Sequence, residues 1–291
     1  MYHPFRFLLS ATLILAVQAT SALGEPFKFK LLAASAETYA HPHDIVLSND
    51  GKRLYVADNG NHRIAVLDAV TLKELSTFGQ GEVDEPHDVV FNAQEQLLVA
   101  DTGNSRIAVY AIGGTGGRLV GQIRGRISRP EGVAVHPDGR VFATGAASGN
   151  LVVYRDGKVV GEVGGFSAPH DVEFAPDGGI WVADAGNDRM VRLNEKLEIT
   201  QTLGRPDFDF NGPRYQDFDE AGRMFVADKY SNNVKVISTD GKLLQVLGKK
   251  ASGKGEGIFN RPEGVEIREN EIWFADTYND RIVRYRVTEG R

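Results

Sequence analysis

One segment plan occurs six times in the 291 residues, and this repetition constrains the fold more than any other feature. Each copy starts with a proline and an alternating strand, turns, and reaches a second apolar strand. The starting prolines are Pro42, Pro86, Pro130, Pro169, Pro213 and Pro262. The second strands end at Asp58, Asp101, Thr144, Asp184, Asp228 and Asp276, 40–48 residues apart. Repeats of this length, with about four strands each, are β-propeller blades. We therefore expect an all-β, six-bladed propeller.

The last copy lacks a fourth strand, because the sequence after its third strand reads only RYRVTEGR. Near the N-terminus, residues 27–32 (FKFKLL) alternate like a strand but belong to no copy. A ring of blades has no open edge only if its two ends share one blade, and open edges invite aggregation. We predict that residues 27–32 form the outer strand of blade six, within a single domain of residues 25–291.

The first 24 residues have the pattern of a secretory signal peptide. Arg6 precedes an apolar run at 7–17, and the small residues Ala22 and Gly24 stand before a possible cleavage point. As a helix, that run would be about 16 Å long, too short for a hydrocarbon core of about 30 Å. We expect residues 1–24 to be removed and the protein to be exported to the periplasm or the extracellular space. We expect the mature chain to be soluble, with no membrane span.

Charge and cysteine content exclude several functions. The whole chain carries a net charge of −6, which disfavours nucleic-acid binding because that needs a basic face. It has no cysteine, so disulfides, thiolate metal sites and a cysteine nucleophile are excluded. We expect a monomer whose partner is a protein, a peptide or a small molecule on one propeller face, since the loops of rigid scaffolds carry function.

A second motif, D-x-x-N-x-R, follows the second strand in four copies, beginning at Asp58, Asp101, Asp184 and Asp276. The third copy has Thr144 instead of the aspartate, and the fifth has Asn233 at the arginine position. We interpret the motif as structural, because aspartate caps turns, asparagine tolerates a left-handed backbone and arginine can bridge to a carboxylate. Together, the blade starts and these loops resemble the NHL repeat family over residues 38–291. The resemblance implies a six-bladed propeller.

The positions after the blade-starting prolines predict a polar ring at one mouth of the central channel. We assign to it His43, His87, Glu131, His170, Tyr215 and Glu263, with Asp44, Asp88 and Asp171 following the three histidines. Converging imidazoles suit zinc. The aspartates could orient them, or bind calcium as oxygen ligands. The alternative is a wet pore without metal, in which the aspartates accept bonds from backbone N–H groups.

The Pro-His-Asp starts also resemble those of the peptidyl-α-hydroxyglycine α-amidating lyases. This resemblance implies a zinc held by His43, His87 and His170, and a tyrosine in a D-G-Y-x-N loop, for which Tyr230 is the nearest match. That family commonly carries a cysteine after the tyrosine, and this chain has none. A lactonase-like channel metal, held by Glu131, Glu263 and Asp171, is a further alternative.

The leading hypothesis from the sequence is an exported scaffold that binds a ligand or a protein. A zinc-dependent lyase is the main alternative, and a lactonase-like hydrolase is a weaker one.

Overall fold

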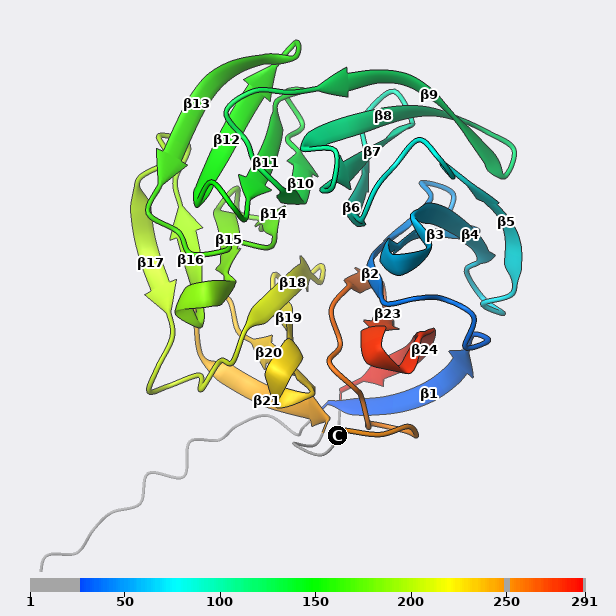
Figure 1. Ribbon diagram of the computed structural model, residues 1–291. Coiled ribbons are helices and arrows are strands. Elements are labelled where there is room, and N and C mark those ends of the chain that lie inside the picture. The colour runs from blue at the N-terminus through cyan, green and yellow to red at the C-terminus, as the bar shows by residue number, and fades with distance from the viewer. Residues whose placement is uncertain (1–26, 249–251, 290–291) are drawn as a thin grey trace, which may run out of the picture.

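A computed structural model describes residues 27–248 and 252–289, and it contains six four-stranded antiparallel sheets arranged around a central axis (Figure 1). The prediction of an all-β, six-bladed propeller is therefore confirmed. Residues 1–24, the predicted signal peptide, lie outside the described residues. Within the described ranges, no helix has the length and hydropathy of a membrane span.

The blades follow one another along the chain, each from an inner to an outer strand. Blade one contains β2 (Pro42–Leu47), β3 (Arg53–Asp58), β4 (Arg63–Asp68) and β5 (Glu74–Phe78). Blade two contains β6 (Pro86–Phe91), β7 (Gln96–Asp101), β8 (Arg106–Gly113) and β9 (Gly116–Ile123). Blade three contains β10 (Pro130–Val135), β11 (Val141–Gly145), β12 (Asn150–Arg155) and β13 (Lys158–Gly164). Blade four contains β14 (Val172–Phe174), β15 (Ile180–Asp184), β16 (Arg189–Leu193) and β17 (Ile199–Leu203). Blade five contains β18 (Pro213–Phe218), β19 (Met224–Asp228), β20 (Asn233–Ile237) and β21 (Leu243–Gly248). Blade six contains β22 (Val265–Arg268), β23 (Glu271–Asp276), β24 (Arg281–Thr288) and β1 (Lys28–Ala34). Short 3-10 turns follow four second strands: η1 (Asn59–Asn61), η2 (Ala185–Asn187), η3 (Lys229–Ser231) and η4 (Thr277–Asn279).

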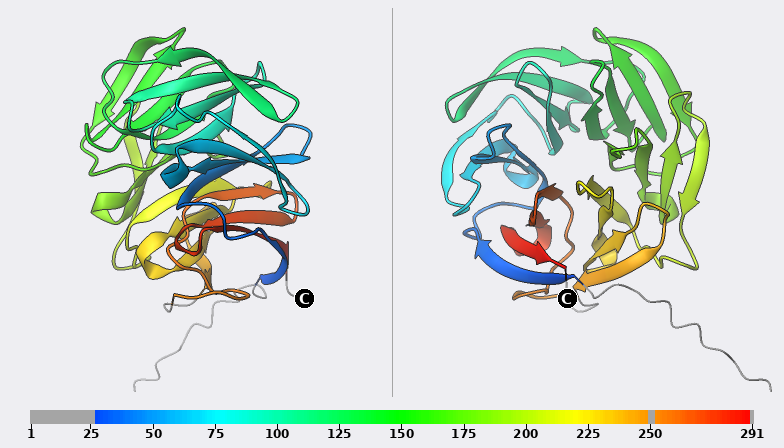
Figure 2. Two further views of the ribbon diagram at one scale, coloured as in Figure 1. Left: turned by 45° about the vertical axis from the view of Figure 1, so that its right-hand side comes forward. Right: turned by 180° about the vertical axis from the view of Figure 1, so that it is seen from behind.

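Blade six is completed by the N-terminal strand, as the sequence predicts. Strand β1 pairs antiparallel with β24, from Lys28 opposite Thr288 to Ala34 opposite Val283, with one register shift between Leu31 and Ala33. Figures 1 and 2 show this blue strand lying along the outside of the red one. The pairing joins the two ends of the described chain and leaves the ring of blades closed.

The D-x-x-N-x-R loops are structural, because each aspartate ties its own blade to the segment before it. In blade one, Asp58 is fully buried, and its Oδ1 accepts from the backbone N–H of Ala40 at 2.8 Å. Its Oδ2 accepts from Asn61 at 2.9 Å and from Arg63 at 2.6 Å. Blades two, four and six repeat these bonds.

The two copies that lack the full motif replace its bonds in different ways. In blade five, Asn233 stands at the arginine position, but Lys235, two residues later, reaches back to form the ion pair with Asp228. In blade three, Pro130 pairs with Gly145 as Pro42 pairs with Asp58, so Gly145, and not Thr144 as the sequence suggested, stands at the aspartate position. Ser148 makes the bond to the preceding segment instead, because its hydroxyl accepts from the backbone N–H of Ser128 at 3.1 Å. The closure of each blade is kept even though the side chain changes.

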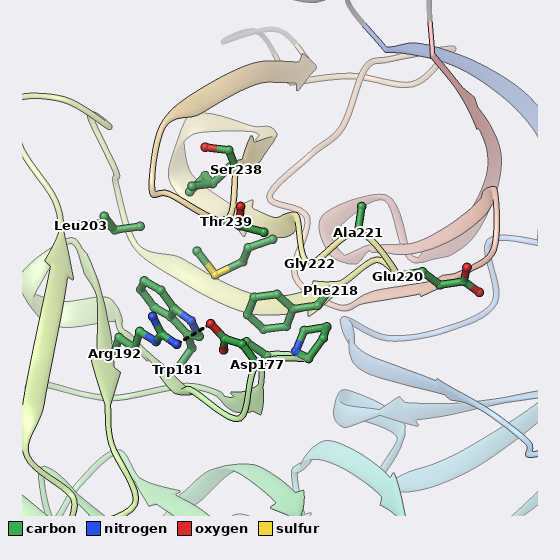
Figure 3. A pocket seen from close by; sticks show the side chains of 14 residues that line it. Asp177, Trp181, Arg192, Leu203, Phe218, Glu220, Ala221, Gly222, Ser238 and Thr239 are labelled. Atoms are coloured by element: carbon green, nitrogen blue, oxygen red, sulfur yellow. Dashed lines mark hydrogen bonds and ion pairs between the residues drawn. The ribbon is translucent and has the colours of Figure 1, made fainter.

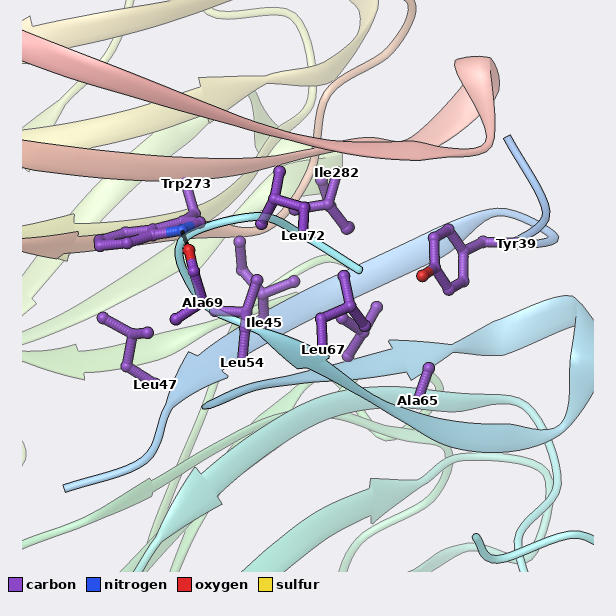
Figure 4. Close-up of a cluster of buried hydrophobic side chains, with 12 residues drawn as sticks. Tyr39, Ile45, Leu47, Leu54, Ala65, Leu67, Ala69, Leu72, Trp273 and Ile282 are labelled. Carbon is purple, nitrogen blue, oxygen red and sulfur yellow. Dashed lines mark hydrogen bonds between the residues drawn. The ribbon is translucent and has the colours of Figure 1, made fainter. Parts of the chain in front are cut away.

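Apolar side chains fill the spaces between neighbouring blades, which we call wedges and number by the blades that they join. Wedge 6/1 contains Ile45, Leu54, Leu67, Leu72 and Trp273, among others (Figure 4). The indole N–H of Trp273 donates to the carbonyl of Ala69 at 2.9 Å, so the one polar atom of this ring is paired. The hydrophobic core is therefore divided into six wedges around a polar channel.

Candidate functional site at the channel mouth

The ring predicted from the sequence is present, with one residue corrected. The residue after each starting proline lies at or just before an innermost strand, and each is at most 9% exposed. In blade five this residue is Arg214, not Tyr215. Pro213 pairs with Asp228 as Pro42 pairs with Asp58, so Arg214 occupies the place of His43 and Tyr215 that of Asp44. The complete ring is His43, His87, Glu131, His170, Arg214 and Glu263.

Three ring residues from three consecutive blades converge closely. His87 Nε2 lies 3.9 Å from one carboxylate oxygen of Glu131, and His170 Nδ1 lies 2.7 Å from the other. One potential ligand atom from each of the three residues lies within 4.8 Å of the other two. The structure therefore brings His87 and His170 together around Glu131, which the sequence analysis placed in the ring and among the ligands of a lactonase-like metal, but not among the zinc ligands.

The protonation of this cluster follows from its burial and charges. Burial, with a smaller contribution from His43, lowers the pKa of His87 to about 3. Its Nδ1 lies 3.0 Å from the carbonyl of Glu85, which can only accept, and 3.2 Å from the side-chain nitrogen of Asn59. With the proton on Nδ1, directed at Glu85, the Nε2 lone pair is available. Burial raises the pKa of Glu131, but His170, His87 and Arg214 outweigh it and bring that pKa to about 2. At neutral pH, His87 is neutral and Glu131 is ionised.

His43 lies beside this cluster but is bound to a different carboxylate. Its Nδ1 is 3.1 Å from Glu263, and its ring centroid is 4.2 Å from that of His87. The other oxygen of Glu263 lies 2.5 Å from Nζ of Lys229. Although burial opposes it, the contacts of Glu263 with His43 and Lys229 hold the pKa of this carboxylate well below its usual value.

Two cations complete the site, and neither was among the candidates from the sequence. Nη1 of Arg214 lies 2.6 and 2.5 Å from the two ring nitrogens of His170, and Nη2 lies 3.3 Å from the hydroxyl of Tyr230. Lys229 follows Asp228, where the other blades have asparagine, threonine or alanine. Lys229 could have been found from the sequence, because it is a charged residue at a repeat position where the other blades have uncharged ones.

Below the ring, the aspartates that follow the histidines bind backbone rather than imidazole. Asp88 accepts from the N–H of Val133 at 2.6 Å, and Asp171 accepts from that of Gln216 at 2.9 Å. No hydrogen bond joins Asp44, Asp88 or Asp171 to a histidine ring within residues 27–248 and 252–289. Burial raises the pKa of Asp88 to about 7, and it raises those of Asp44 and Asp171 as well.

Tyr215 closes the channel beneath the ring. It is 1% exposed, and its hydroxyl lies 3.1 Å from the carbonyl of His87 and 3.2 Å from that of Glu131. The phenol therefore ties blade five to blades two and three across the axis. It is a plug under the site rather than a member of the ring.

Deeper in the channel, the innermost strands of blades four to six carry three further carboxylates, each two residues after the position that Asp171 and Tyr215 occupy. They are Glu173, Asp217 and Glu266. Burial, with Asp217 adding to it, raises the pKa of Glu173 to about 8. The matching positions in blades one and two are Val46 and Val90. The sequence analysis missed these carboxylates, although counting every second residue along each innermost strand would have found them.

An aromatic and cationic rim lies next to the ring. Tyr230 of η3 and Tyr278 of η4 are 48% and 37% exposed, which is unusual for such large side chains here. The guanidinium of Arg261 lies 4.5 Å from the ring centroid of Tyr278 and 5.7 Å from that of Tyr230. Tyr230, the candidate catalytic residue from the sequence, therefore contacts the ring through Arg214 and is open to solvent.

Comparison with known proteins supports the repeat assignment. The NHL repeat family model matches residues 39–67 and 84–110. NHL repeat-containing protein 2 of Gallus gallus is 36% identical over 70 residues, covering 22% of this chain and 10% of that protein. A probable peptidyl-alpha-hydroxyglycine alpha-amidating lyase of Caenorhabditis elegans is 25% identical over 193 residues, covering 56% of this chain and 55% of that protein. The chain thus spans about half the length or less of these relatives.

Solved structures share the fold at low sequence identity. Virginiamycin B lyase of Staphylococcus aureus superposes with a TM-score of 0.63 and 15% identity, covering 90% of this chain and all of that one. An auxiliary nutrient binding protein of Bacteroides ovatus gives a TM-score of 0.70 and 14% identity, covering 91% and 78% of the two chains. The chain is thus a six-bladed β-propeller with NHL repeats matched at residues 39–67 and 84–110.

Proposed function

We propose that the chain holds a divalent metal, zinc, at the channel mouth through His87, His170 and Glu131, and that it is a metal-dependent lyase of the amidating-lyase kind. The observation that carries this proposal is the convergence of three donors from three blades within 4.8 Å. Two imidazoles and one carboxylate are a ligand set of catalytic zinc sites, which keep a further position for water or substrate. The similarity to the Caenorhabditis elegans lyase supports the reaction class.

The state of the donors fits a metal. The buried Glu131 oxygen that faces His170 makes no hydrogen bond of good geometry, and neither does His43 Nδ1. His87 presents an unprotonated nitrogen toward an ionised Glu131, which are the forms that bind zinc. Arg214 must turn away from His170 to release its lone pair, and the hydroxyl of Tyr230, 3.3 Å away, is an acceptor that it already reaches. His170 then faces Glu131 across the place for the ion.

The surrounding side chains have distinct roles in such a reaction. A bound zinc would supply a Lewis acid for a substrate oxygen. Arg214, which is 9% exposed, binds a substrate carboxylate at the mouth. Tyr230 relays the proton of the substrate hydroxyl to the amide nitrogen as the bond between that nitrogen and the hydroxylated carbon breaks. The products are therefore a peptide amide and glyoxylate.

A metal-free binding scaffold is the second candidate, and the charges of the ring favour it. Glu131 and Glu263 carry two negative charges, and Arg214 and Lys229 carry two positive ones, so the buried ring is balanced without an ion. In this case the exposed pair Tyr230 and Tyr278, with Arg261 between them, would bind a ligand above a rigid mouth.

Metal analysis of the purified protein separates the two functions. For the enzyme, we expect about one zinc per chain in the wild type and its loss in His87→Ala, because two remaining donors bind zinc poorly. His136→Ala is the matched control, since His136 follows β10 at the end opposite the ring and pairs with Asp138. An α-hydroxyglycine-extended peptide should then be cleaved by the wild type and by His136→Ala, but not by His87→Ala.

The opposite result is equally clear. A wild type that binds no zinc, and whose melting temperature does not change when zinc is added, would remove the lyase and leave the scaffold. A zinc-loaded protein that leaves the peptide intact would keep the metal site and contradict the reaction.

A further inference from the structure

Wedge 4/5 contains a cavity of about 280 Å³ at the end of the innermost strands away from the ring (Figure 3). Its apolar walls come from Trp181, Leu203, Phe218, Met224 and Ile237, and Asp177 and Arg192 form an ion pair of 2.6 Å at its edge. These walls come from blades four and five, so the cavity lies between two neighbouring blades, where packed side chains fill the space in wedge 6/1. It shares no residue with the channel mouth.

Wedge 6/1 shows what fills the same space in another pair of blades. Trp273 and Trp181 both stand three residues before the aspartate that ends the second strand. In wedge 6/1 the turn Asp68–Lys73 covers the indole: Leu72 is 1% exposed, and the carbonyl of Ala69 accepts the indole N–H (Figure 4). A leucine side chain and a peptide carbonyl thus complete that wedge.

The matching turn of blade five supplies neither group. Equivalent hydrogen bonds close the two turns, from Asp68 N–H to Lys73 and from Ser238 N–H to Lys242, but the second turn is one residue shorter. Gly241 has a positive φ of 77° in this turn, as Leu72 has in the longer one. A methyl group on Gly241 would lie 2.5 Å from the side-chain nitrogen of Gln201 and 3.3 Å from Leu203, so these side chains occupy that place and the turn sends no leucine into the wedge.

The indole N–H of Trp181 is left without a partner. Within residues 27–248 and 252–289, no acceptor lies within hydrogen-bonding distance of Nε1 of Trp181, whereas that of Trp273 is bonded at 2.9 Å. Trp181 is 6% exposed and lines the cavity. Its Nε1 is not among the fully buried atoms without a partner, so its N–H is accessible from the cavity and available to a ligand that carries an acceptor.

We propose that this cavity binds a small neutral molecule that combines a branched aliphatic body with a carbonyl group. The aliphatic body lies against Leu203, Met224 and Ile237, which line the cavity. The carbonyl accepts the N–H of Trp181, as the carbonyl of Ala69 accepts that of Trp273. Apolar walls with one or two placed polar groups are typical of small-molecule sites. The site is independent of the proposed metal site and of its reaction.

The two tryptophans of the chain give the test its readout, because an amide-correlation NMR spectrum contains one indole signal for each. The probe is N-acetyl-leucine methylamide, titrated into the wild-type protein, with the signals assigned from Trp181→Phe. We expect a saturable shift of the Trp181 signal and no shift of the Trp273 signal. N-acetyl-alanine methylamide has the same amides without the branched body, and we expect less than about a third of the shift at equal concentration.

A graft provides the matched control. Replacing residues 238–242 by the sequence of residues 68–73 introduces the leucine and the extra residue, so it should fill the cavity and abolish the response. In Trp181→Phe, followed by the methyl signal of Met224, the affinity for the probe should fall at least threefold. Equal shifts of both indoles, no shift up to the solubility limit, or a folded graft that still responds would overturn the proposal. If the graft does not fold, an unchanged affinity in Trp181→Phe would do so.

Discussion

In wedge 6/1 the indole of Trp273 lies under the turn Asp68–Lys73, whereas in wedge 4/5 the indole of Trp181 faces a cavity beneath the shorter turn Ser238–Lys242. The two tryptophans have the same place in the repeat, and both are at most 6% exposed. The difference comes from one residue of turn length and from Leu72 against Gly241. A repeated scaffold can therefore keep its strands and still open a binding site where a single turn is shortened.

The blades of the two wedges also differ inside the channel. At the corresponding positions of the innermost strands, blades six and one carry Glu266 and Val46, while blades four and five carry Glu173 and Asp217. Wedge 4/5 therefore has two channel carboxylates and a cavity, whereas wedge 6/1 has one channel carboxylate and a filled core. If the two wedges also differ in how much they stabilise the fold, changes to each should alter the free energy of unfolding by different amounts; the largest expected effect comes first.

Removing residues 27–34 should have the largest effect, because it takes away the strand that completes blade six. Phe29 and Leu31 pack into wedge 5/6, and Ala33 packs against wedge 6/1. We expect the free energy of unfolding to fall by on the order of 5 kcal/mol, measured by urea denaturation. The exposed Lys28 and Lys30 give the control, because changing both to Gln keeps the backbone pairing. An unchanged melt of the deleted chain would refute the closure.

Truncation of each tryptophan to alanine should lower the free energy of unfolding by different amounts in the two wedges. Trp273→Ala opens a cavity in a filled wedge and should cost about 3–5 kcal/mol. Trp181→Ala enlarges an existing cavity, and part of its indole surface is not in contact with protein, so we expect roughly half of that loss. The measurement is urea denaturation of both variants at one pH. Equal losses would mean that the cavity of wedge 4/5 closes in solution.

The channel carboxylates should make stability depend on pH in a known direction. The folded-state pKa of Glu173 is about 8, above that of a free glutamate, because burial and Asp217 favour its neutral form. Stability is therefore highest below the unfolded pKa and is lost as the pH rises through the folded pKa. Glu173→Gln removes this loss, so its melting temperature should exceed that of the wild type by roughly several degrees at pH 9, and by much less at pH 5. A constant difference across this range would contradict the shift.

Removing only the indole N–H should have the smallest effect, and the two wedges should still differ. Trp273→Phe loses the bond to the carbonyl of Ala69 and leaves that acceptor buried, which should cost about 1 kcal/mol beyond the change in ring size. Trp181→Phe breaks no hydrogen bond, so its extra cost should be below about 0.5 kcal/mol. The difference between the two free energies of unfolding is the quantity to compare. A zero difference would indicate that Trp181 has found an acceptor.

The fold was predictable from the sequence because its signals are local and repeated. The six prolines and the Ala-Asp strand ends set the blade count, and residues 27–32 together with the missing fourth strand predicted the closure. The candidate site was predictable only where the repeat position keeps its chemistry, as at His87 and His170. In blade five, Tyr215 was placed in the ring because it looked like a ring residue, whereas strand pairing assigns that place to Arg214.

Other parts of the site depend on contacts between blades, which no repeat pattern contains. Lys229 belongs to blade five but neutralises Glu263 of blade six, and Lys235 replaces an arginine from a different position along its strand. The cavity of wedge 4/5 depends on how far one turn reaches across its neighbour. Such distances follow from packing, not from the identity of any single residue.

The pairing of β1 with β24 has a consequence for the order of events during synthesis. Lys28 leaves the ribosome early, but its partner Thr288 is made almost at the end of the described chain. Blades one to five can form one after another from local contacts, while β1 has to wait without its partner. A chain halted before Arg281 would present both β1 and the outer edge of β23 as open strands, ready to pair with other copies. The synthesis of β24, the last strand, therefore also ends the exposure of β1, the first strand.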